Sequence, residues 1–331
     1  MSEPFSHRVL PYDGIDDFLA GAMPFLRDGI DAGDRVLAVT GIGSEAVLRD
    51  ALGPPGAGRV EFVAPDRWYA HPARTLADCL GDADRLCGEG RRLRVLAEPA
   101  WTARSPLEVL EWQRLEAIVN VAFAGTGAAI LCPYARSLPA GVVAAARRTH
   151  PETLRGDRAV GNPGYMDPWA YNSLCDRVPL PAPPDDAWTL TIDRPDLYWL
   201  RAYVTDYARL TPLAEEDLQR LLVAVTEVVT NATNHGRPPM VLRMWVEWRE
   251  AAFVCEVTDA GRWPAGSGRG LIPPRPDGPG RFGLWAVRLL CSMVQIRTGD
   301  DGTAVRLRLR LPSVPATVGA RGGSTTGGGG G

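Results

Sequence analysis

The chain has 331 residues, of which 45% are hydrophobic and 23% charged, and this balance is typical of a globular protein with room for two domains. The formal net charge of −3 gives no bulk electrostatic case for a nucleic-acid partner. No apolar run reaches the roughly 18 residues of a membrane span, and residues 1–8 show no signal-peptide pattern. We therefore expect a cytoplasmic protein that binds neither membrane nor nucleic acid directly.

Residues 6–177 are expected to form one domain in which buried strands alternate with helices. Strands are predicted at 34–40, 60–63, 94–98 and 128–132, and helices at 44–52, 73–87 and 106–123. Ser105 precedes the third helix and is its predicted N-cap. This alternation predicts a three-layer α/β fold with a largely parallel sheet.

The second half has a different order of elements. Residues 178–187 are proline-rich and are predicted to form an extended linker. In 188–312 we predict strands at 188–192, 241–249, 252–259 and 303–311, and helices at 197–208, 214–235 and 282–293. Helices on one face of such a sheet make an α+β sandwich. The glycine-rich tail 313–331 is expected to be disordered.

Polar side chains gather on one face of the predicted helix 214–235. Glu227, Asn231, Asn234 and His235 are spaced i, i+4, i+7 and i+8, so they share that face. An amide beside a carboxylate suits Mg²⁺, with Asn231 as the direct ligand and Glu227 able to accept a proton. An isolated ExxxN spacing usually marks only a polar stripe. We interpret the copy at 116–120 in that way, because no Asp-x-Gly follows it at strand-end distance.

Two later segments supply groups that a nucleotide needs. Asp259 ends an apolar strand and could accept an adenine amino hydrogen, while Gly261 lets the backbone approach the base. Backbone N–H groups at the start of the helix after Phe282 could hold phosphates, and Arg281 or Arg288 could add charge. Alone, each segment is more often a simple turn. The predicted nucleotide-binding residues of these segments are Asp259, Gly261, Gly280, Arg281, Gly283, Leu284 and Thr303, with Thr303 reaching the base through water.

In this order and spacing, the three segments resemble the N, G1 and G2 boxes of the GHKL (Bergerat-fold) ATPases, over residues 188–311. The resemblance is nearest to the anti-sigma-factor (serine kinase) branch. It implies ATP and Mg²⁺ as cofactors, with Glu227 as base, Asn231 holding Mg²⁺ and Asp259 recognising adenine. It also implies a sigma factor or a STAS-type anti-sigma-factor antagonist as partner, and a possible homodimer.

Two other interpretations stay open at this stage. A sensor histidine kinase-like enzyme would need a phosphoacceptor histidine on an exposed dimerisation helix, and the segment before this domain is the proline linker. A degenerate GHKL scaffold would bind partners without turning over ATP. Arg262 and Trp263, which stand where a further glycine is common, favour that second alternative.

Five short segments of the N-terminal half, at 7–12, 33–36, 98–101, 131–134 and 149–151, resemble the MEDS sensory domain, a RecA/KaiC-like fold without ATPase motifs. Residues 41–44 follow the first predicted strand but lack the lysine of a P-loop, so ATP is not expected there. The resemblance implies a small-molecule sensor. Glu98, Cys132 and Tyr134 stand at the carboxyl ends of strands and are the predicted sensory pocket. The alternative, in which Glu98 caps a loop and Cys132 is a core residue, stays open.

Three residues of the N-terminal half are of types that bind metal ions. His7, Cys132 and His150 are ligand types, but no two of them have a local ligand spacing. The sequence therefore does not favour a metal ion at these residues.

Overall fold

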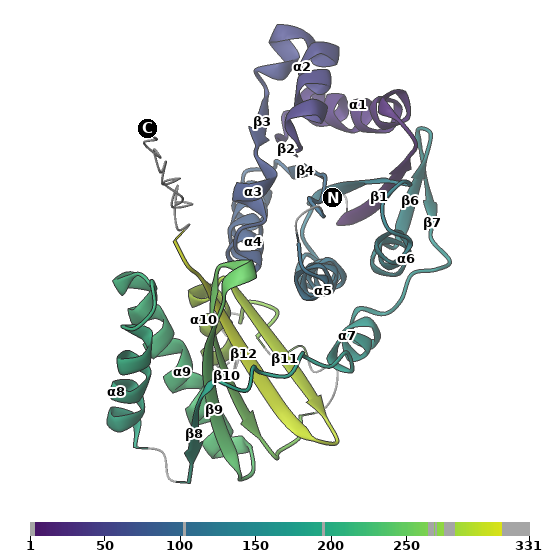
Figure 1. Cartoon of the computed structure of the whole chain (residues 1–331). Coiled ribbons are helices and arrows are strands. Elements are labelled where there is room, and N and C mark those ends of the chain that lie inside the picture. Colours follow the sequence, from purple (N-terminus) through teal and green to yellow (C-terminus); the bar gives the residue numbers. More distant parts are fainter. Residues whose placement is uncertain are drawn as a thin grey trace, which may run out of the picture.

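The computed structural model describes residues 4–101, 104–193, 196–263, 268, 270–274 and 282–312. The predicted tail 313–331 and the predicted phosphate-binding residues Gly280 and Arg281 lie outside these ranges. Within them, the chain folds into two units, each built on one sheet (Figure 1). None of the helices in these ranges combines the length and the apolar character that crossing a bilayer demands.

The N-terminal unit is a seven-stranded sheet with the strand order β3-β2-β4-β5-β1-β6-β7. Neighbouring strands are parallel except for the antiparallel pair β6–β7. Its elements are β1 (Ser6–Tyr12), α1 (Ile15–Ala32), β2 (Arg35–Val39), α2 (Ile42–Ala57), β3 (Val60–Val63), α3 (Pro65–Trp68), α4 (Pro72–Gly88), β4 (Leu93–Ala97), α5 (Pro106–Ala122), β5 (Ala129–Ala135), α6 (Ala140–Thr149), β6 (Glu152–Arg155), β7 (Arg158–Gly161) and α7 (Pro168–Asp176).

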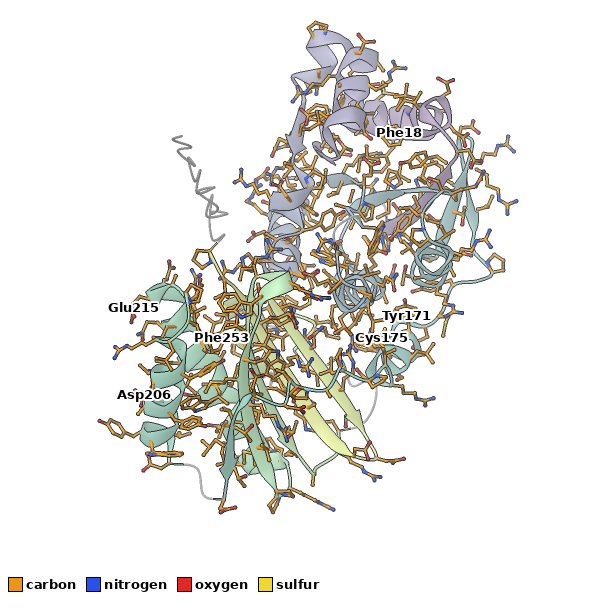
Figure 2. All side chains as sticks on the ribbon, in the orientation of Figure 1. Phe18, Tyr171, Cys175, Asp206, Glu215 and Phe253 are labelled. Carbon is orange, nitrogen blue, oxygen red and sulfur yellow. The ribbon has the colours of Figure 1, made fainter. Side chains whose placement is uncertain are left out.

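Both faces of this sheet are buried, as expected for parallel strands. Val36 and Ala38 face a core with α1 and α2, whereas Leu37 and Val39 face a second core with α4, α5 and α6. Phe18 marks the first core in Figure 2. The predicted N-cap of α5 is present, because Ser105 Oγ accepts the Glu108 N–H at 3.3 Å and Glu108 Oε2 accepts the Ser105 N–H at 2.9 Å. Such a cap contributes about 1 kcal/mol to helix stability.

The C-terminal unit is a five-stranded antiparallel sheet with the order β11-β12-β10-β9-β8. Three helices, α8, α9 and α10, pack on one face around a core that includes Phe253, which is labelled in Figure 2. The elements are β8 (Trp188–Ile192), α8 (Leu197–Ala208), α9 (Glu215–His235), β9 (Met240–Glu247), the 3₁₀ turn η1 (Trp248–Glu250), β10 (Ala252–Asp259), α10 (Gly283–Leu290), β11 (Met293–Gly299) and β12 (Gly302–Arg310).

The predicted fold classes of both units are confirmed, whereas several elements were missed. The elements that were not predicted are β1, α1, α3, α6, β6, β7, α7 and β11. The last helix was also predicted to extend to Met293, but α10 ends at Leu290 and β11 begins at Met293. The reason is a distant partner: Ser292 N and Oγ both donate to Arg308 O of β12, at 3.0 and 2.7 Å, which turns the chain into the sheet.

The opposite face of the C-terminal sheet is polar and is crossed by the linker. Arg306 and Glu256 form an ion pair there at 2.6 Å, with both side chains 4% exposed. Arg306 Nη2 also donates to Pro181 O at 2.8 Å, and Arg297 Nε donates to Val178 O at 2.6 Å. Residues 178–187 therefore lie against this face rather than free in solvent.

The two units share a hydrophobic core at α10. Trp285, 5% exposed, and Leu271 join the N-terminal core formed by α4 and α5, whereas Val287 joins the C-terminal core. Polar contacts reinforce the junction: Arg74 Nε donates to Leu289 O at 2.8 Å. Helix α10 thus lies between the N-terminal helices and the C-terminal sheet (Figure 1).

Truncation of Trp285 should weaken this junction. We expect Trp285→Ala to lower the free energy of unfolding by about 3–5 kcal/mol, as for other buried tryptophans, and to make the linker near Pro181 more sensitive to limited proteolysis. Trp248→Ala is the matched control, because Trp248 is 67% exposed and such surface changes stay within about 0.5 kcal/mol. Equal losses in the two variants, measured by urea unfolding, would contradict the shared core.

Candidate functional site

Helix α9 presents the first group of site residues. Leu221, Val225, Val228, Val229 and Ala232 are buried against the sheet. The turns between them leave Glu227 and Asn231 partly exposed, and Asn231 Nδ2 donates to Glu227 Oε1 at 2.9 Å. Two of the residues predicted to share a face of this helix, Glu227 and Asn231, are therefore joined by a hydrogen bond. Asn231 keeps its carbonyl oxygen for another partner.

Asp259 stands at the end of β10, beside the end of α9. Its side chain is buried, and its Oδ1 accepts the N–H groups of Gly261 at 2.7 Å and Arg237 at 3.2 Å. Burial raises the pKa of Asp259 above its usual range, and the two backbone hydrogen bonds oppose that shift. Both of these donors use Oδ1, which leaves Oδ2 to receive a hydrogen from a bound molecule.

Glycines make room for this carboxylate. A Cβ at Gly236 would lie 2.5 Å from Asp259 Oδ1, and a Cβ at Gly261 would lie 2.7 Å from the same atom. Gly302 has φ +107° and faces the Asp259 carbonyl oxygen, where a Cβ would be 2.1 Å away. Any side chain at these positions would displace Asp259, so the three glycines fix where its carboxylate lies.

The start of α10 meets the middle of α9. A Cβ at Gly283 would lie 1.9 Å from Glu227 Oε1, so the carboxylate is in direct contact with the first residue of α10. The N–H groups of this first turn have no partners within the helix and favour negative charge. Glu227, Asn231 and Gly283 therefore meet on α9, whereas Asp259 lies beside the C-terminal end of that helix.

The other predicted residues of this site are placed as follows. Asn234 and His235 are exposed on the last turn of α9, and Leu284 packs against the C-terminal core. Thr303 is buried, and its Oγ1 donates to Gly261 O at 2.9 Å. It therefore supports the loop after Asp259.

Arg288 does not serve the phosphates, contrary to one of the alternatives raised above. Its Nη1 donates to Val294 O at 2.8 Å, and its side chain lines a small cavity at the junction with Glu111 and Leu115. Burial lowers the pKa of this guanidinium to about 10. The side chain points toward the N-terminal unit because Trp285 and Arg288, three residues apart, share one face of α10.

Sequence reasoning missed the backbone contribution of Gly236, Arg237 and Gly302. The Arg237 N–H bonds Asp259, and Ala260 N donates to Arg237 O at 2.8 Å, so the end of α9 is tied to the end of β10. The signal was the glycine that directly follows His235. The role of Gly236, which is to leave room for the Asp259 carboxylate, depends on the tertiary contact between the two residues.

Of the predicted sensory residues, Glu98 directly follows β4 and Tyr134 lies near the carboxyl end of β5, as predicted, whereas Cys132 is in the middle of β5, because that strand continues to Ala135. Glu98 accepts the Tyr12 hydroxyl at 2.9 Å and the Gly41 N–H at 3.4 Å. Tyr134 donates to Glu116 Oε2 at 2.6 Å, and burial raises the pKa of Glu116 to about 7. Cys132 is buried, with Sγ 3.6 Å from His7 Nε2.

A cleft of about 840 Å³ opens between β1, β5, β6, α1 and α6. Its polar lining includes Asp17, Arg136, Arg147 and Arg155, together with Tyr134. Of the three predicted sensory residues, Tyr134 alone is among the described residues that line this cleft. The cleft stands at the strand ends where open α/β sheets bind ligands.

Comparison with protein families identifies both units. Residues 6–151 match the family MEDS, the methanogen/methylotroph DcmR sensory domain, and residues 193–309 match the histidine kinase-like ATPase domain. The chain therefore carries a MEDS domain followed by a domain of the GHKL-type ATPase family, and the predicted recognition of both is confirmed. A search of curated proteins returned no match.

Solved structures show more distant likenesses. The RsbU and RsbW domains of Rv1364c from Mycobacterium tuberculosis are 21% identical over 40% of this chain and 33% of that chain, with a TM-score of 0.29. The histidine kinase domain of the blue-light activated histidine kinase EL346 from Erythrobacter litoralis is 16% identical over 75% of this chain and 95% of that chain, with a TM-score of 0.23. The chain spans about a third of the first of these structures, and at these TM-scores the likenesses add nothing to the family matches.

Replacing one carboxylate oxygen of Asp259 by an NH₂ group, in Asp259→Asn, tests whether this side chain recognises adenine. In Asp259→Asn an amide can still accept the Gly261 and Arg237 N–H groups, but an NH₂ replaces the free oxygen and opposes the adenine amino group. We expect the affinity for ATP, measured by calorimetry, to fall about 10- to 100-fold, as for loss of a charged hydrogen bond. Asp206→Asn on the exposed side of α8 should leave the affinity unchanged; unaltered ATP binding in Asp259→Asn would rule out this assignment.

Removal of the Asn231 amide should separate the metal from the nucleotide. Because Asn231 is the predicted Mg²⁺ ligand, Asn231→Ala should bind ATP with an affinity that no longer rises when Mg²⁺ is added. The wild-type chain, titrated in Mg²⁺ and in a chelator, supplies the comparison. A full Mg²⁺ response in the variant would assign the metal to other residues.

Proposed function

We propose that this protein is an ATP-binding regulator in which the MEDS domain receives a small-molecule signal and the ATPase domain acts on a protein partner. The partner would be a sigma factor held in a complex, an anti-sigma-factor antagonist phosphorylated on a serine, or both. One observation carries the proposal: Gly283, the first residue of α10, meets the Glu227–Asn231 pair of α9, and Asp259 lies beside the C-terminal end of the same helix.

The donor set fits Mg²⁺. Asn231 offers a carbonyl oxygen and Glu227 a carboxylate, and Mg²⁺ prefers such hard oxygen ligands together with phosphate oxygens and water. A bound Mg²⁺ would neutralise charge on the phosphates. Asn231 would hold it, while Glu227 stays hydrogen-bonded to the Asn231 amide.

Glu227 has the position that a base needs for phosphoryl transfer to a hydroxyl. Its carboxylate touches the α10 N-terminus, where backbone N–H groups favour phosphate oxygens. In the proposed reaction, a partner serine oxygen forms a bond to the γ-phosphorus, the bond to the β-phosphate oxygen breaks and ADP leaves. Glu227 accepts the serine proton as the new bond forms.

A signal can reach this site through α10. The helix meets Glu227 at Gly283 and packs Trp285 into the MEDS core. A shift of the N-terminal helices α4 and α5 would therefore move the phosphate-binding turn relative to Glu227. This contact supports regulation of the ATPase domain by the sensory domain.

The histidine kinase alternative has less support. Of the four histidines, His7 and His150 are 2% and 0% exposed, His71 precedes α4 and is half-buried, and His235 ends α9. None of the four lies on an exposed helix ahead of the ATPase domain. The scaffold alternative, in which partners bind without ATP turnover, is an outcome of the experiment below, and a homodimer stays a prediction.

Transfer of label from γ-³²P-ATP tests the function. The full chain is incubated with candidate STAS-type antagonists and sigma factors, and label on a serine of an antagonist is the expected result. Glu227→Gln should bind ATP with wild-type affinity yet lose transfer by about 10²–10⁴-fold, the usual contribution of a general base. Glu215→Gln, an exposed change at the start of the same helix, is the matched control.

Other outcomes separate the alternatives. Label on a histidine of this chain would favour the histidine kinase interpretation. ATP-dependent capture of a sigma factor without label would favour sequestration, and absence of ATP binding in the wild-type chain would leave only the scaffold. Transfer that persists in Glu227→Gln would exclude Glu227 as the base.

A further inference from the structure

Three ligand-type side chains from distant parts of the chain meet inside the N-terminal unit. His7 is on β1, Cys132 is on the neighbouring strand β5, and His150 directly follows α6. Among the described residues, each offers one ligand atom, and these atoms lie within 4.8 Å of one another. All three side chains are buried, with exposed fractions of 2%, 4% and 0%. The parallel pairing of β1 with β5 brings His7 and Cys132 to the same face of the sheet.

Other residues orient both imidazole rings. His7 Nδ1 is 3.1 Å from Asn120 Oδ1, and His150 Nδ1 is 2.9 Å from Ala146 O. Asn120 cannot turn its amide, because its Nδ2 donates to Thr149 O at 2.7 Å. Since both oxygens accept, each ring carries its hydrogen on Nδ1 and has a lone pair on Nε2. A carbonyl or amide oxygen on the far ring nitrogen is the usual support of metal-binding histidines.

The two Nε2 lone pairs are not both satisfied by protein groups. The Cys132 thiol can donate its single hydrogen to His7 Nε2, 3.6 Å away. His150 Nε2 is buried and has no hydrogen-bond partner among the described residues. A buried polar atom left without a hydrogen bond destabilises the fold. A cation bound by all three atoms would satisfy both rings and the thiolate together.

The spacing fits one metal class. In a tetrahedral zinc site, with Zn–S about 2.3 Å and Zn–N about 2.05 Å, sulfur and nitrogen lie about 3.6 Å apart. The Cys132 Sγ to His7 Nε2 separation is 3.6 Å. Imidazole and thiolate are ligands that zinc prefers over oxygen-seeking cations.

We propose that His7 Nε2, Cys132 Sγ and His150 Nε2 bind one thiophilic transition-metal ion, Zn²⁺ being the expected ion, with the fourth coordination position open. Three protein ligands and an open position characterise zinc sites that take an external ligand. Tyr134, whose ring lies 5.8 Å from that of His150, and Ala146 both line the 840 Å³ cleft. The metal would therefore lie one layer of residues from the cleft of the sensory domain, and its binding does not depend on the ATPase site.

Cobalt substitution tests the site directly. The full-length chain, purified without a histidine tag and stripped with a chelator under reducing conditions, is titrated with Co²⁺. We expect one Co²⁺ per chain, a thiolate-to-cobalt charge-transfer band in the near ultraviolet, visible bands of four-coordinate cobalt, and displacement by Zn²⁺. Zn²⁺ should also raise the Tm of the wild-type chain.

Variants distinguish this site from adventitious binding. Cys132→Ser should lose the charge-transfer band, and Asn120→Ala, which frees the His7 ring, should weaken Co²⁺ binding about 10- to 100-fold. Cys175→Ser, a buried cysteine on α7, and His71→Asn are matched controls and should leave the spectrum unchanged. A band that persists in Cys132→Ser would overturn the proposal. The proposal would also be overturned if the wild-type chain showed neither the cobalt spectrum nor a Zn²⁺-dependent Tm. This second test does not depend on whether any variant folds.

Discussion

The packing of one short helix into two cores is the constraint on which the arrangement of this protein depends. Helix α10 buries Val287 against the C-terminal sheet and Trp285 among the helices of the MEDS domain. Its first residue, Gly283, touches the Glu227 carboxylate. These contacts all lie within eight residues, so one short helix connects the two cores with the Glu227 carboxylate.

Buried ion pairs surround this junction. They determine the relative orientation of the two units more than they add to stability. Glu111 pairs with Arg297 at 2.9 Å, and Arg114 pairs with Asp176 at 2.7 Å, all with side chains at most 10% exposed. Desolvation offsets most of the attraction within such pairs, so they add little to stability, but an orientation that breaks them is strongly disfavoured. Arg114 Nη2 and Arg297 Nη2 have no hydrogen-bond partner among the described residues. The buried pairs therefore favour one orientation of the two units over others.

Two helices carry the same ExxxN spacing with different consequences. On α9 the Glu227–Asn231 pair meets Gly283 at the start of α10. On α5, Asn120 orients His7, and Glu116 accepts the Tyr134 hydroxyl. Interpreting the α5 copy as a polar stripe on a surface helix was therefore wrong. Spacing determines which side chains share a face, whereas the tertiary structure determines what that face meets.

The sequence by itself determined the features that depend on backbone periodicity and on local chemistry. Both fold classes, the register of α9, the N-cap of α5 and the order of the three segments that resemble the GHKL boxes follow from residues close together in the chain. Only the tertiary structure decided the contacts made across long separations. Strand order in the parallel sheet brought His7 and Cys132 together, although their spacing had disfavoured a metal site. Pairing with β12 ended α10 early, and docking on the MEDS helices turned Arg288 away from the phosphates. Such contacts depend on which distant segments become neighbours, and no local pattern encodes that choice.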